Sequence, residues 1–140
     1  MSALDKFRIL VVEDTRDISD LLVIRLELGG YVTCVARNCE QAIAQAFAFK
    51  PNAILLDIGL GDGGDGFEVL RILKSSTKTS DIPVLMLTAR QQLTDIRRAI
   101  DMGARDYVTK PFDDRKLLMR VAKLLGQPMP HLTTERRMML

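Results

Sequence analysis

The 140-residue chain has no tryptophan, one histidine and two cysteines, and aromatic residues make up only 5% of it. Two cysteines, Cys34 and Cys39, are too few for a disulfide framework, and their spacing matches no zinc-binding pattern. We interpret them as free thiols in a reducing compartment, which predicts a cytoplasmic protein. The single His131 stands alone near the C-terminus and is not expected to act as a ligand or base.

Long apolar runs and a dominant charge sign are also missing. No run approaches the roughly 20 residues that a membrane-spanning helix needs, and the N-terminus lacks the apolar core of a signal peptide. Lysine and arginine number 20 against 18 acidic residues, a formal net charge of +2. This balance gives no indication of a nucleic-acid or membrane surface. We therefore expect no membrane association and no direct nucleic-acid binding by this chain.

Two kinds of segment alternate along the sequence. Short apolar runs, mostly continuous as in strands buried on both faces, occupy residues 9–12, 32–35, 53–56, 84–87 and 107–109. Stretches with helical periodicity follow them at 18–28, 41–49, 67–73, 93–102 and 113–125. Five successive βα units predict an α/β fold with a doubly wound five-stranded parallel sheet and five helices. Residues 1–126 form the predicted domain, and residues 127–140 a tail or linker.

Polar side chains follow the predicted strands at their carboxyl ends. Glu13 and Asp14 end the first strand, Asp57 the third, Thr88 the fourth and Lys110 the fifth. In a doubly wound sheet these ends meet at one edge, where ligands bind. Three clustered carboxylates repel one another and need a cation, and oxygen ligands suit Mg²⁺, with Mn²⁺ as an alternative. With an added ammonium and a hydroxyl, the set predicts a site for a phosphoryl group on a carboxylate.

These residues give the chain a family resemblance. Together with the stretch 103–112, they make roughly residues 7–125 similar to the receiver domain of two-component response regulators. The resemblance implies a flavodoxin-like strand order of 2-1-3-4-5. It implies that Asp57 accepts a phosphoryl group from a histidine kinase or a histidine phosphotransfer protein. It also implies a signalling protein in a phosphorelay and not an enzyme, apart from phosphoryl acceptance and self-dephosphorylation.

The resemblance further assigns a role to each site residue. Glu13, Asp14, Asp57 and the backbone carbonyl of Gly59 are expected to hold Mg²⁺. Lys110 is expected to pair with the phosphoryl oxygens and to precede a cis peptide bond to Pro111. Thr88 and Tyr107 are the expected switch residues, which change the face made by the fourth helix, the fifth strand and the fifth helix. Through that face the chain is expected to contact an output protein or domain. Phosphorylation is also expected to allow two copies of the chain to form a homodimer.

The loop after Asp57 departs from the family pattern. It lacks the usual proline four residues on, where Gly61 stands, and the glycine that opens the third helix, Gly66, comes at the ninth position where the eighth is usual. This glycine-rich loop costs more conformational entropy to order, so higher mobility is predicted. Asp65 is predicted to cap the third helix.

These residues allow four functional interpretations, of which the fourth, an inactive pseudo-receiver, is disfavoured by the intact Asp57, Thr88 and Lys110. The first is a stand-alone receiver that acts by protein–protein contact. The second is the receiver of a longer DNA-binding response regulator, with residues 127–140 as a linker; Arg105 stands where such regulators often have an acidic residue at their dimer face. The third is a phosphatase with an aspartate nucleophile, which needs a second acid two residues later; Gly59 occupies that position and disfavours this reading.

Overall fold

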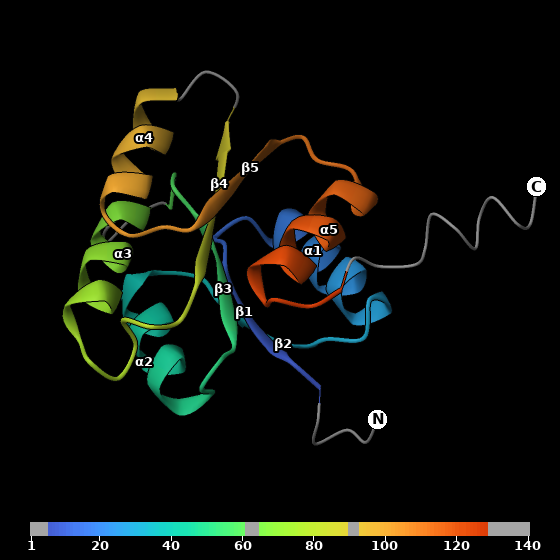
Figure 1. The fold of residues 1–140 in the computed structure, drawn as a ribbon, viewed down its shortest axis with the longest axis horizontal. Coiled ribbons are helices and arrows are strands. Elements are labelled where there is room, and N and C mark those ends of the chain that lie inside the picture. Colours follow the sequence, from blue (N-terminus) through green and yellow to red (C-terminus); the bar gives the residue numbers. More distant parts are fainter. Residues whose placement is uncertain (1–5, 61–64, 90–92, 129–140) are drawn as a thin grey trace, which may run out of the picture.

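The computed structural model describes residues 6–60, 65–89 and 93–128, and within them the predicted α/β fold is confirmed (Figure 1). Five parallel strands form one sheet in the order β2-β1-β3-β4-β5. The strands are β1 (Arg8–Val12), β2 (Val32–Ala36), β3 (Ala53–Asp57), β4 (Val84–Ala89) and β5 (Asp106–Lys110). The helices are α1 (Arg16–Leu28), α2 (Cys39–Ala48), α3 (Gly66–Ser75), α4 (Leu93–Asp101) and α5 (Asp114–Leu124).

Helices cover both faces of the sheet, which explains the continuous apolar runs of the strands. Successive strand side chains point to opposite faces. Ile9 and Val11 of β1 pack with α1 and α5, whereas Leu10 and Val12 pack on the other side with α2 and α3. Figure 1 shows α1 and α5 on one side of the sheet and α2, α3 and α4 on the other. The inner strands β1, β3 and β4 are therefore buried, and the carboxyl edge of the sheet is left as the place for polar groups.

Side-chain caps fix where three of the helices begin. The carboxylate or amide oxygens of Asn38, Asp65 and Asp113 accept hydrogen bonds from backbone amides three residues later, at 2.8, 2.9 and 2.7 Å. Each bond satisfies one of the amides that a helix start leaves without an intrahelical partner. The predicted capping role of Asp65 is thus confirmed. The cap at Asn38 also starts α2 two residues before the predicted position.

Gly66 brings the start of α3 against the end of β3. Its amide donates to the Ile58 carbonyl at 3.0 Å, and a Cβ at this position would lie 2.3 Å from the Asp57 carbonyl oxygen. No side chain fits at that distance, so the close packing requires glycine. The contact anchors the backbone of Asp57, the predicted phosphoacceptor, to a helix.

Two further expectations concern the loop after β3 and the membrane. Residues 61–64 lie outside the described residues, and the predicted mobility of this loop stays a prediction. Among the helices of the described segments, none has both the length and the apolar content to cross a membrane.

Candidate functional site

Three carboxylates meet at the carboxyl edge of the two central strands. Glu13 and Asp14 follow β1, and Asp57 ends the neighbouring β3, with Val12 in register with Leu56. One carboxylate oxygen from each of the three lies within 4.8 Å of the others. Glu13 and Asp57 are buried and Asp14 is exposed, so the cluster has a dry side and a side open to solvent. The sequence prediction that these residues come together is confirmed.

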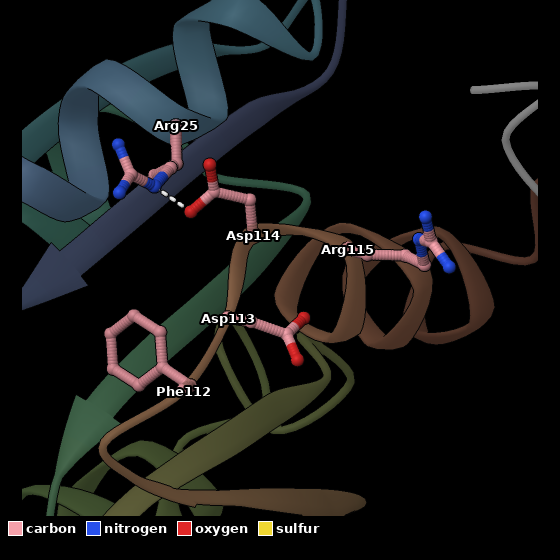
Figure 2. A pocket seen from close by; sticks show the side chains of 5 residues that line it. All are labelled: Arg25, Phe112, Asp113, Asp114 and Arg115. Atoms are coloured by element: carbon pink, nitrogen blue, oxygen red, sulfur yellow. Dashed lines mark ion pairs between the residues drawn. The ribbon is translucent and has the colours of Figure 1, made fainter. Parts of the chain in front are cut away.

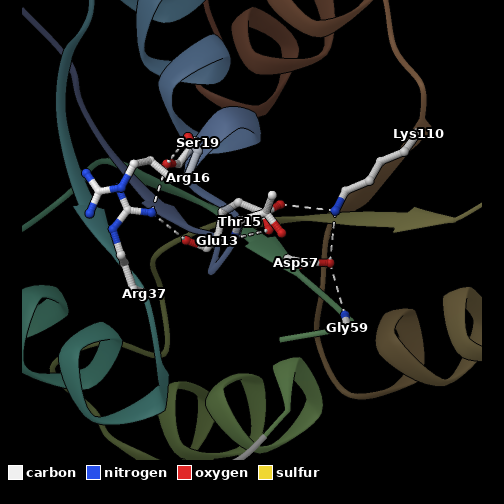
Figure 3. A network of polar contacts seen from close by, with 8 residues as sticks. All are labelled: Glu13, Thr15, Arg16, Ser19, Arg37, Asp57, Gly59 and Lys110. Carbon is white, nitrogen blue, oxygen red and sulfur yellow. Dashed lines mark hydrogen bonds and ion pairs between the residues drawn. The ribbon is translucent and has the colours of Figure 1, made fainter. Parts of the chain in front are cut away.

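Lys110 reaches the cluster from β5, two strands away from β3. Its Nζ lies 3.0 Å from Glu13 Oε1 and 3.3 Å from Asp57 Oδ1 (Figure 3). The ammonium therefore bridges the two buried carboxylates. The next peptide bond, Lys110–Pro111, is cis, as predicted. An extended lysine side chain can carry its charge over the intervening strand, which a shorter residue at the same strand end cannot do.

The charge of Lys110 offsets only part of the negative charge of the three carboxylates. Burial, and then the negative charge of Asp57, raise the pKa of Glu13 to about 7, although Lys110 acts in the opposite direction. Burial disfavours the ammonium of Lys110, but the charges of Asp57 and Glu13 outweigh burial and raise its pKa. Three carboxylates with one fixed cation retain a negative excess. This donor set of hard oxygens, partly open to water, fits a divalent cation such as Mg²⁺.

The residues after β3 orient the Asp57 carboxylate. The backbone amide of Gly59 donates to Asp57 Oδ1 at 3.0 Å (Figure 3). A Cβ at Gly59 would lie 3.8 Å from that oxygen, which is ordinary van der Waals contact. Gly59 thus leaves space beside the carboxylate without being required by sterics. Its expected role as a carbonyl ligand stays a prediction.

The two predicted switch residues differ in burial. Thr88 of β4 is 1% exposed and directly follows Leu87, which is in register with Asp57. Tyr107 of β5 is 37% exposed and is in register with Met86. A buried hydroxyl residue near the phosphoacceptor strand and a solvent-facing aromatic on the edge strand are compatible with the expected switch. Their movement stays a prediction.

Two cavities lie between α1 and the segment that follows β5. An apolar one of about 340 Å³ is lined by Ile18, Leu21, Lys110, Pro111 and Phe112. A more polar one of about 510 Å³ lies between Arg25 of α1 and the start of α5, where Arg25 and Asp114 form an ion pair (Figure 2). Lys110 therefore belongs both to the carboxylate cluster and to the wall of an apolar pocket beside it.

Sequence reasoning missed a polar network behind Glu13. Arg37, in the loop between β2 and α2, donates from Nη1 to Ser19 Oγ at 3.0 Å and to the Glu13 carbonyl at 3.5 Å. Ser19 is fully buried in α1, and its hydroxyl donates to the Arg16 carbonyl at 3.0 Å. One sequence feature could have indicated this network: Ser19 lies on the side of α1 that faces the core. A buried hydroxyl needs a hydrogen-bond partner, so a polar neighbour could have been predicted there.

Comparison with known proteins agrees with this geometry. Residues 9–122 match the family model described as "Response regulator receiver domain". A relative from Synechocystis sp., named as the DNA-binding dual master transcriptional regulator RpaA, is 45% identical over 118 residues, which cover 84% of this chain and 48% of the relative. The phosphate regulon regulatory protein PhoB of Pseudomonas aeruginosa is 39% identical over 122 residues, covering 87% and 53%. The chain thus spans about half the length of these relatives.

Solved structures give the same result. A response regulator structure from Chloroflexus aurantiacus has a TM-score of 0.83 at 29% identity, covering 88% of this chain and 100% of that one. The receiver domain of the sensor histidine kinase PA1611 from Pseudomonas aeruginosa, with a magnesium ion coordinated in its active-site cleft, has a TM-score of 0.79 at 26% identity, covering 87% and 99%. By its sequence, its strand order and its edge of acidic residues, the chain belongs to the response regulator receiver domain family.

Proposed function

We propose that this receiver domain is a phosphorylation switch in which Asp57 accepts a phosphoryl group from a histidine kinase or histidine phosphotransfer protein. The observation that carries the proposal is the gathering of Asp57 with Glu13 and Asp14, with the Lys110 ammonium 3.3 Å from Asp57 Oδ1. In the transfer, the phosphorus–nitrogen bond of the donor histidine breaks and a phosphorus–oxygen bond to Asp57 forms. The chain releases its phosphoryl group by hydrolysis and has no other reaction to catalyse.

The residues of the cluster have separate roles in this proposal. Glu13, Asp14, Asp57 and the carbonyl of Gly59 would hold Mg²⁺, or Mn²⁺ in its place, and the ion would offset the charge on the phosphoryl oxygens. Lys110 already contacts both buried carboxylates and needs only a small movement to pair with a phosphoryl oxygen. Thr88 would donate its hydroxyl to another oxygen. Positioning and charge neutralisation are the main contributions a protein makes to phosphoryl transfer.

An exposed apolar side of α1 supports a protein as the phosphoryl donor. Leu21, Ile24 and Leu28 recur at helical spacing, and Ile24 and Leu28 are 53% and 80% exposed. Leu21 also lines the apolar pocket that shares Lys110 with the phosphoacceptor site. The donor histidine must reach Asp57, so its protein has to cover this neighbouring surface. Packing of an apolar helix face against α1 would hold it there.

Two outputs are compatible with the switch. In the first, the chain signals to a separate protein through the face of α4, β5 and α5 after Thr88 and Tyr107 rearrange. In the second, the output is a DNA-binding domain on the same polypeptide. The second is favoured by the relatives, of which the matched region makes up only about half, and one of which, RpaA, is named as a DNA-binding regulator. In neither case is the receiver itself proposed to contact DNA.

The proposal is tested by incubation with Mg²⁺ and acetyl phosphate, followed by phosphate-affinity electrophoresis and intact-mass measurement. Wild type is expected to gain one phosphoryl group, and Asp57→Asn none. Asp17→Asn, which alters an acidic residue in the first turn of α1, serves as the matched control and should still be modified. An adduct that persists in Asp57→Asn, or no adduct in wild type, would overturn the assignment.

A further inference from the structure

Arg37 lies outside the carboxylate cluster but is connected to it by hydrogen bonds. Its Nη1 contacts two points of the segment that carries the acidic residues, the Glu13 carbonyl and the Ser19 hydroxyl. Along the chain, Asp14 and the first turn of α1 lie between these two points; Figure 3 shows both contacts of Arg37. One guanidinium therefore spans the turn that presents two of the three carboxylates.

The backbone of Arg37 is itself held in place. Its amide donates to Gln41 Oε1 at 2.8 Å, and the Gln41 amide donates to the capping oxygen of Asn38 at 2.8 Å. Both bonds involve Gln41, and together they tie the residues before α2 to its first turn. Next to it, the Glu13 amide donates to the Ala36 carbonyl at 3.0 Å. The guanidinium thus extends from a rigid loop, as a positioning group requires.

The other end of the contact is equally constrained. Ser19 is fully buried, its hydroxyl donates to the Arg16 carbonyl, and its amide donates to the Thr15 carbonyl at 3.0 Å. Thr15 in turn donates its amide to Glu13 Oε2 at 3.2 Å. A continuous chain of hydrogen bonds therefore runs from Arg37 through the first turn of α1 to the Glu13 carboxylate.

We propose that Arg37 and Ser19 form a brace that sets the Glu13–Asp14 turn in its cation-binding geometry before the ion arrives. The inference rests on the proposed Mg²⁺ site. Repulsion among the three carboxylates favours their separation when no cation is bound, and the brace opposes that movement. Arg37 is thus a positioning residue, which touches neither the phosphoryl group nor the ion. Hydrogen-bonded groups behind metal ligands commonly change metal affinity by about 10–100-fold when removed.

The test measures the Mg²⁺ dissociation constant by following the amide resonances of the site in an NMR titration, with thermal unfolding recorded separately. Arg37→Met and Ser19→Ala are each expected to weaken Mg²⁺ binding, Arg37→Met by about tenfold. Because they break one brace, the double variant should be little weaker than Arg37→Met alone. Arg8→Met is the matched control. It removes an arginine that bonds the Phe49 and Lys50 carbonyls at the amino end of β1, and it should leave Mg²⁺ affinity unchanged.

Each alternative gives a different result. If Arg37 acted only through its charge, Arg37→Met would bind Mg²⁺ more tightly and Ser19→Ala would equal wild type. If it were only a stabilising contact, both variants would unfold at lower temperature with unchanged affinity. Either result overturns the brace while leaving the metal site intact. Absence of Mg²⁺ binding in wild type would instead overturn the proposed site, and the brace with it.

Discussion

At the scale of single residues, Glu13 combines full burial with a charge that the fold offsets only in part. Its pKa is raised to about 7 from an ordinary value of 4.5, first by burial and then by Asp57. The folded state therefore holds the proton more tightly than the unfolded state. The stability gained in this way is complete below about pH 4.5 and is lost as the pH rises through about 7. The pKa of Lys110 is raised above its ordinary, already basic value, so this group adds no pH dependence between pH 4.5 and 7.

A comparison of wild type with Glu13→Gln isolates this contribution. The variant carries no ionisable group at this position, so without Mg²⁺ we expect wild type to lose stability relative to it between pH 5.5 and pH 8. The free energy of unfolding of wild type, relative to that of Glu13→Gln, is expected to fall by an amount on the order of 2 kcal/mol over this range. Thermal unfolding followed by circular dichroism in chelator-containing buffer measures it. A difference that stays constant across this pH range would contradict the raised pKa.

At the scale of single elements, α1 has two tasks on opposite sides. Its buried side carries Leu22 and Leu26, which pack against the sheet, and its first turn carries the Arg37–Ser19 brace. Its outer side exposes Ile24 and Leu28. Exposed apolar side chains in a row add little to the stability of this domain, and such a row is typical of a surface that a partner covers. One helix therefore carries both the turn that supports the site and the surface on which we propose that the donor docks.

The double substitution Ile24→Ser with Leu28→Ser tests the docking side of α1. We expect phosphorylation by a histidine phosphotransfer protein that modifies wild type to slow by about tenfold or more, because the few residues that a partner buries at the centre of an interface each cost more than about 1 kcal/mol when truncated. Phosphorylation by acetyl phosphate should not change, because a small donor needs no docking surface. Initial rates from phosphate-affinity gels measure both reactions.

The matched control for this pair is Phe47→Ser, which removes a similarly exposed apolar side chain from α2. It should leave both donors unaffected. If phosphorylation of the α1 variant by acetyl phosphate and by the protein donor slows equally, the substitutions have damaged the phosphoacceptor site itself. If neither reaction slows, this side of α1 does not receive the donor.

At the scale of the whole molecule, the sequence predicts most of the fold because its periodicities are local. The apolar runs predict the strands. Because the carboxyl ends of parallel strands lie at one edge of the sheet, the predicted fold also places Glu13, Asp57 and Lys110 together. The role of Arg37 could not be predicted, because its contact with Ser19 joins elements 18 positions apart through side-chain direction alone. The packing of Gly66 against the Asp57 carbonyl likewise depends on how closely two elements approach.

The switch proposed for the whole molecule connects the carboxyl edge to the face of α4, β5 and α5. That face exposes Leu93 and Ile100 of α4 and Tyr107 of β5. Inward rotation of Tyr107 would remove an exposed side chain next to α4 and change this face, on which two copies would need to bury about 1,000 Å² or more for a stable interface. We therefore expect the unmodified chain to sediment as a monomer, and the chain with Mg²⁺ and beryllofluoride to sediment as a dimer.

Ile100→Ser separates dimer formation from occupancy of the site. The variant should still bind beryllofluoride, detected by fluorine NMR, but should remain a monomer in analytical ultracentrifugation because an exposed apolar side chain of α4 is lost. Phe47→Ser on α2 should dimerise like wild type.

A positive charge at Arg105, exposed at the start of this face, opposes self-association, so Arg105→Glu should strengthen the dimer. A wild-type monomer that persists with beryllofluoride bound would contradict signalling through dimer formation.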